Sequence, residues 1–257
     1  MNVSAFKLTK TRVECTQYAI VGKYASGSRD FVAHAALLKV TCDVSVDKLM
    51  GVWECGPPIV GTENMEGRFG ENKCIVSVVA DLRLVPTERD AVANFLQGVE
   101  KQYRSRNILP FQQYKLIPHA DWVIAPETGR RIRRRFSCCG FVIEAYADAG
   151  IVLLDTYNLP AAELRDVEAA YPSLIRLTNC PEKIQRKFGF LGLDDIGLGK
   201  NAPWQLALPG YLFHACDGVD PRTVDAPFVA PSVKYASFPL EKPAPPLAEE
   251  RNMRTRD

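Results

Sequence analysis

Two adjacent cysteines, Cys138 and Cys139, begin a segment with helical spacing, FSCCGFVIEAY, directly after the arginine-rich run GRRIRRR. A thiol in the first turn of a helix lies beside backbone N–H groups that carry partial positive charge, and nearby cations lower its pKa further. Both influences act on Cys138, which predicts a thiolate nucleophile. The competing interpretation is a buried structural cysteine, because free cysteines are among the most buried residues. For Cys139 we expect a packing role.

Such a nucleophile needs a base that moves protons and a third group that orients the base. The chain has three histidines that could serve as this base. His34 lies in DFVAHAALLKV, an expected strand that would hold its ring in one place. His214 lies in YLFHACDGVD, also an expected strand, with Asp217 and Asp220 behind it. His119 lies in a segment without period, so the residue pattern favours His34 over His214 and leaves both open.

The elements that must position these groups follow an α+β pattern. Alternating or continuous apolar runs predict strands at about 15–25, 31–40, 48–55 and 73–85. Helical spacing predicts helices at about 87–104, at 138–149 with Gly150 as the stop, and from Pro160 onward. Residues 131–136 are expected to form a short strand or an extended arm, and 204–216 one or two strands.

The composition of the whole chain is that of an ordinary globular protein. Its 257 residues, 47% hydrophobic and 24% charged, suffice for one sizeable core. We expect one domain over 1–220 and a proline-rich arm or tail over 221–257. A formal net charge of +2 is too small to indicate a nucleic-acid or membrane partner. Since the sequence contains neither a signal-peptide pattern nor a long apolar segment, the expected location is cytoplasmic.

The eight cysteines are scattered through a chain large enough to fold without disulfides, so free thiols are expected. There is no C-x-x-C pair, and with three histidines a structural zinc site has little support. We therefore expect no metal and no cofactor.

The segment FSCCGFVIEAYADAGI resembles the nucleophile helix of the papain-like NlpC/P60 superfamily, with Cys138 at the nucleophile position and Cys139 where serine is usual. DFVAHAALLKV resembles the family's histidine strand, and GVWECGPPIV resembles the strand that carries the polar third residue. A histidine that precedes the cysteine is the order of the circularly permuted branch, which includes YiiX-like hydrolases and lecithin:retinol acyltransferase-like enzymes. The resemblance covers about residues 15–175.

This resemblance implies a fold in which an antiparallel sheet packs against the helix that carries the nucleophile. It also implies a catalytic set of Cys138, His34 as the base and Glu54 as its orienter, with backbone N–H groups at the helix start stabilising the oxyanion. Relatives often place a tyrosine near the oxyanion, and Tyr103 or Tyr114 fits that position. The implied reaction is acyl transfer from a peptide, amide or lipid-like substrate.

The resulting expectation is a thiol hydrolase that cleaves an amide or ester bond through an acyl-enzyme. A thiol-dependent acyltransferase on the same site is the first alternative.

The arginine run has three interpretations: a solvated face, a recognition site for an anionic substrate or partner, or a nucleic-acid patch. Arg133 and Arg135, with Tyr114, are the substrate-binding candidates. Aromatic residues are not interleaved with the run as a base-stacking surface would require, which disfavours nucleic acid. A further alternative is a non-catalytic binding module that uses the segment 130–135.

Overall fold

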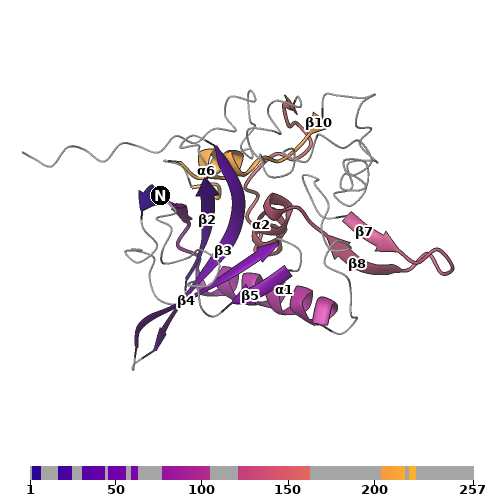
Figure 1. The fold of residues 1–257 in the computed structure, drawn as a ribbon, viewed down its shortest axis with the longest axis horizontal. Coiled ribbons are helices and arrows are strands. Elements are labelled where there is room, and N and C mark those ends of the chain that lie inside the picture. Colours follow the sequence, from indigo (N-terminus) through magenta and orange to yellow (C-terminus); the bar gives the residue numbers. More distant parts are fainter. Residues whose placement is uncertain are drawn as a thin grey trace, which may run out of the picture.

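The computed structural model describes residues 2–6, 17–24, 31–43, 46–55, 59–62, 77–104, 121–162, 204–217 and 220–223. These residues form a mixed α+β structure in which three helices accompany one large sheet and two small ones (Figure 1). None of the described helices has the length and hydropathy needed to cross a bilayer.

The large sheet has six strands in the order β1-β6-β2-β3-β4-β5, with every neighbouring pair antiparallel. Its strands are β1 (Asn2–Phe6), β2 (Tyr18–Tyr24), β3 (Val32–Asp43), β4 (Val46–Cys55), β5 (Ile59–Thr62) and β6 (Ser77–Asp81). The four strands expected from the sequence are thus confirmed as β2, β3, β4 and β6. Among the described residues, β1 and β5 extend the sheet at its two edges.

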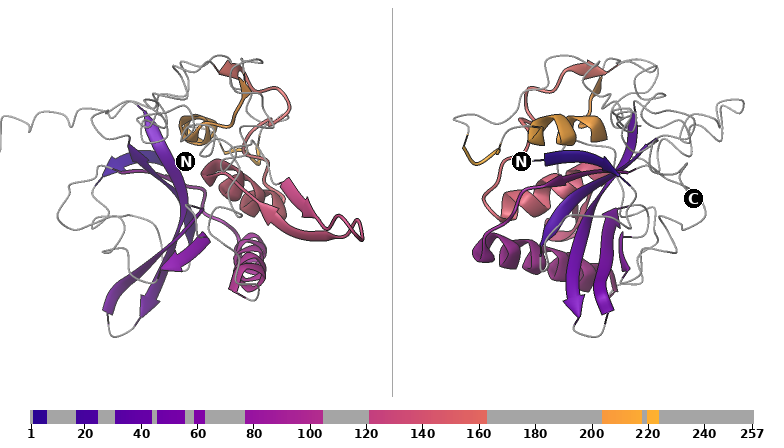
Figure 2. Two further views of the ribbon diagram at one scale, coloured as in Figure 1. Left: turned by 45° about the vertical axis from the view of Figure 1, so that its right-hand side comes forward. Right: turned by 90° about the vertical axis from the view of Figure 1, so that its left-hand side faces the viewer.

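The helices α1 (Pro86–Arg104), α2 (Cys138–Asp148) and α6 (Pro209–Cys216) lie on one side of this sheet (Figure 2). The expected helix at 87–104 is confirmed, with Pro86 at its first position, where a missing N–H costs nothing. The carboxylate of Glu88 accepts a hydrogen bond from the N–H of Val85 at 2.9 Å. Glu88, three residues after Val85, therefore contributes to the cap.

The apolar faces of sheet and helices meet in one core cluster. Phe95 of α1 contacts Phe136 and Phe141 at the start of α2, with ring centroids 6.0 and 5.6 Å away. Phe213 of α6 packs against Gly22 of β2 so closely that a Cβ there would lie 2.6 Å from the ring. These contacts hold the first turn of α2 and the middle strands of the sheet in fixed positions.

One expectation about the second half of the chain is wrong, and another holds only in part. Ala161–Ala162 forms the strand β9, which pairs with β10 (Trp204–Gln205), so a helix does not begin at Pro160. The segment 204–216, expected to form one or two strands, forms the short strand β10 and then helix α6 in place of a second strand. A short apolar run is compatible with a strand or a buried helix, and here Pro209 at the first helical position decides for the helix.

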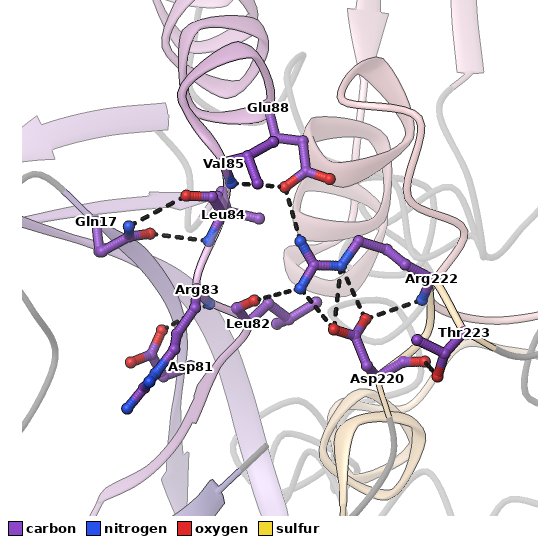
Figure 3. A network of polar contacts seen from close by, with 10 residues as sticks. All are labelled: Gln17, Asp81, Leu82, Arg83, Leu84, Val85, Glu88, Asp220, Arg222 and Thr223. Carbon is purple, nitrogen blue, oxygen red and sulfur yellow. Dashed lines mark hydrogen bonds and ion pairs between the residues drawn. The ribbon is translucent and has the colours of Figure 1, made fainter.

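The chain beyond α6 returns to the beginning of α1 (Figure 3). Arg222 donates hydrogen bonds to the Leu82 carbonyl at 2.8 Å and to Glu88 at 2.9 Å, and it also bonds both carboxylate oxygens of Asp220. The first residues of the expected arm thus bind the domain, while 224–257 lies outside the described residues. The boundary at 220 stays a prediction.

Candidate active site

The first turn of α2 holds Cys138 at the N-terminal end of the helix. The hydroxyl of Ser137, the N-cap residue, accepts a hydrogen bond from the N–H of Gly140 at 2.9 Å. The other end closes in a Schellman motif at Gly150, whose φ of 76° suits glycine. Because the first turn contains no acidic residue, the partial positive charge of the helix end acts on the Cys138 sulfur without local opposition.

The strand β3 carries His34 to the same region. It lies between β2 and β4 in the sheet and packs against α2. Its pairing with β2 shifts beside His34, since Lys23 pairs with His34 whereas Tyr24 pairs with Val32, which leaves Ala33 as an extra residue. Such a bulge redirects neighbouring side chains and is frequent next to active sites. The His34 side chain is partly buried.

The candidate nucleophile, Cys138, and the candidate base, His34, are in contact. The pKa of the Cys138 thiol lies well below its ordinary value of 9.0 because the Cys139 thiol, the His34 imidazole and the N–H of Ala35 all hydrogen-bond to it, and the imidazole charge adds to this. Burial of Cys138, a residue that is 1% exposed, acts in the opposite direction. The Cys138 and Cys139 sulfurs are 4.0 Å apart. A thiol so surrounded can be deprotonated with a proton carrier beside it.

A second buried thiol shows how specific this setting is. Burial, together with the charges of Asp220 and Asp217, raises the pKa of Cys216 to about 12. Cys216 lies at the C-terminal end of α6, where the helix presents carbonyl groups. Two thiols of similar burial are therefore shifted in opposite directions by the groups around them.

Glu54, the expected orienter, lies in β4 opposite Val60 of β5. It is next to Trp53, which pairs with Leu37, so continuation of the register places position 54 beside Ala36 of β3. Residues two apart along a strand share a face, and position 54 is then diagonal to position 34. The backbone thus carries Glu54 to the neighbourhood of His34; its side chain lies outside the described residues.

The remaining candidates fall in different places. Arg133 and Arg135 belong to β8 (Arg131–Arg135), which pairs with β7 (Asp121–Ile124) to form a hairpin that leads directly into α2. The Arg135 side chain is partly buried. His214 is in the last turn of α6 and not in a strand. Tyr114 and His119 lie outside the described residues, as does the side chain of Tyr103.

Sequence reasoning missed three contributors to this site. Ser137 is the N-cap, and the signal was available in a serine that precedes an apolar helical run. Cys139 was assigned to packing, although its sulfur hydrogen-bonds to that of Cys138. The backbone N–H of Ala35 carries no sequence signal, because every residue except proline has one.

No group of three or more histidine, cysteine, aspartate or glutamate side chains within the described ranges is arranged to hold a metal ion. The chain matches no protein-family model, and it has no significant match among curated proteins or among solved structures. The assignment of a function therefore rests on the residues and their geometry.

Proposed function

We propose that the protein is a thiol hydrolase that cleaves an amide or ester bond through an acyl-enzyme on Cys138, with a papain-like arrangement of the permuted NlpC/P60 type. The observation that carries this proposal is the hydrogen bond between the Cys138 thiol and the His34 imidazole at a helix N-terminus, where the thiol pKa is lowered. The antiparallel sheet with His34 on a central strand and the nucleophile on the packed helix supports the same arrangement.

The reaction begins with transfer of the Cys138 proton to His34. The sulfur attacks the carbonyl carbon, a C–S bond forms, and the oxyanion is stabilised by the N-terminal end of α2. The tetrahedral species collapses when the leaving amine or alcohol takes the proton from the imidazolium of His34. Water, deprotonated by His34, then attacks the thioester, which releases the acid and restores the thiol. Glu54 is the group we assign to hold the imidazole in one orientation.

The test is acylation by p-nitrophenyl acetate, which releases p-nitrophenol, whose ionised form is yellow. We expect a rapid burst of nitrophenol and an acetyl group on Cys138 that mass spectrometry of the digested protein locates. Cys138→Ser should remove both, and His34→Gln should slow the burst while circular dichroism shows an intact fold. Cys216→Ser is the matched control, because its high thiol pKa predicts an unchanged burst.

Labelling spread equally over the cysteines, or a burst that survives Cys138→Ser, would contradict the proposal. An acyltransferase on the same site is the second candidate, since the resemblance includes acyltransferases. Added amine or alcohol acceptors distinguish the two, because a transferase moves the acetyl group to the acceptor faster than to water.

A further inference from the structure

The β7–β8 hairpin has a face made of aromatic, aliphatic and arginine side chains, which we call the Arg–Trp face: Trp122, Ile124, Arg131 and Arg134. The guanidinium carbons of Arg131 and Arg134 lie 5.3 and 5.0 Å from the centroid of the Trp122 ring. Both distances fall within the range of cation–π contacts. The arginine run itself contains no aromatic residue, and the ring that its side chains contact is that of Trp122 in the neighbouring strand.

A bulge creates this face. Arg131 and Arg134 are three residues apart, so in a regular strand their side chains would point to opposite faces. The register shifts between Val123 and Ile124, which leaves Ile132 as an extra residue in β8. The shift pairs Arg134 with Trp122 and Arg131 with Ile124, two residues that share one face of β7.

The charge of this face is only partly neutralised within the part of the chain that the structure describes. Arg134 forms an ion pair with Glu144 of α2 at 3.4 Å. Arg131 is exposed and pairs with no carboxylate of the described residues. A guanidinium is planar and has five N–H donors, with which it can bind a carboxylate through two hydrogen bonds. Ile124, 46% exposed, adds an apolar contact beside them.

We propose that the Arg–Trp face binds an acidic peptide segment of a partner protein, with a carboxylate on Arg131 and an apolar side chain on Ile124. Nucleic acid fits less well, because the arginines already occupy the ring on which a base would stack. A membrane surface also fits less well, since the exposed turn 125–130 carries Glu127 and no large apolar side chain. In Figure 1 the hairpin extends away from the large sheet. The proposal is independent of the chemistry at Cys138.

The test measures the binding of a short fluorescent peptide, in which Glu alternates with Leu, to the full chain by anisotropy. We expect affinity to fall as salt is raised and to weaken about two- to fivefold in Arg131→Gln. Arg131→Lys keeps the charge without the planar fork and should bind more weakly than the wild type. Lys101→Gln, which removes an exposed charge from α1, is the matched control and should bind as the wild type does.

Three results would overturn the proposal. The first is the same affinity in Arg131→Gln and Lys101→Gln. The second is wild-type affinity in Arg131→Lys. The third is tighter binding of a single-stranded oligonucleotide or of phosphatidylserine vesicles than of the acidic peptide at equal ionic strength. Circular dichroism of each variant verifies that binding is compared between folded proteins.

Discussion

Replacement of His34 by glutamine tests the central interaction of the candidate site. Glutamine can still form a hydrogen bond, but it cannot carry the positive charge that favours the Cys138 thiolate. Burial of the sulfur, which opposes ionisation, remains in the variant. We therefore expect the pKa of Cys138 to rise toward or above the ordinary value of 9.0.

The size of the effect follows from the ionised fraction. A thiol with a pKa of 9.0 is about 1% ionised at pH 7, so a thiol that is mostly ionised there has up to about a hundredfold more thiolate. The direction of the pKa shift determines how the thiolate fraction depends on pH. In the wild type, thiolate is present at pH values well below 9.0, and it disappears as pH falls through the lowered pKa.

Thiolate absorbance near 240 nm, recorded against pH, measures this fraction directly. Absorbance reports the thiolate directly, so the measured fraction does not depend on how fast a reagent reaches Cys138, which is 1% exposed. Subtraction of the Cys138→Ser titration isolates this thiol, and the same subtraction is made in the His34→Gln background. Cys216→Ser should not change the curve below about pH 10, since burial raises the pKa of Cys216 to about 12. Identical difference curves with and without His34, or a wild-type midpoint at 9.0 or above, would refute the reasoning.

Three further perturbations have defined outcomes. Cys139→Ala removes the S–H donor and should raise the pKa of the nucleophilic thiol, whereas Cys139→Ser keeps a donor and should raise it less; the same absorbance titration measures both. Gly22→Ala places a methyl group 2.6 Å from an aromatic ring and should destabilise the fold by about 1–3 kcal/mol in urea unfolding. Arg222→Gln loses the hydrogen bond to the Leu82 carbonyl and its ion pairs, and should lower stability by about 1–2 kcal/mol and the Tm by several degrees.

Each of these has its own control. Equal titrations of the alanine and serine variants at position 139 would show that the Cys139 sulfur has no such role. Gly98→Ala adds a methyl group where nothing lies within 4 Å and should stabilise α1 by about 0.8–1 kcal/mol, opposite in sign to the change at Gly22. The Arg222 side chain lowers the pKa of Asp220 from 3.8, so its stabilisation is present above that pH and is lost as pH falls through the lowered value. The hydrogen bond to the Leu82 carbonyl does not depend on pH, so a difference between Arg222→Gln and the wild type that is equally large above and below that pH would contradict this.

Local sequence patterns predicted secondary structure correctly where the structure of a segment depends mainly on its own residues. Alternation predicted β2 and β3, and helical spacing with proline and glycine at the ends predicted α1 and α2. The same local reasoning failed at 204–216, where a short apolar run has no distinctive period. It also failed after Pro160, because the pairing of Ala161–Ala162 with β10 involves residues more than forty positions away.

The sequence by itself determined that a thiol stands at a helix start behind a run of arginines, because both features depend on neighbours along the chain. It did not determine which histidine lies beside that thiol, since His34 and Cys138 are separated by more than a hundred residues. Packing of α2 on β3 decided this, and with it the lowered pKa of Cys138. Strand pairing likewise decided that Trp122 contacts Arg131 and Arg134. The electrostatic environment of a side chain depends on distance in space, which tertiary structure alone sets.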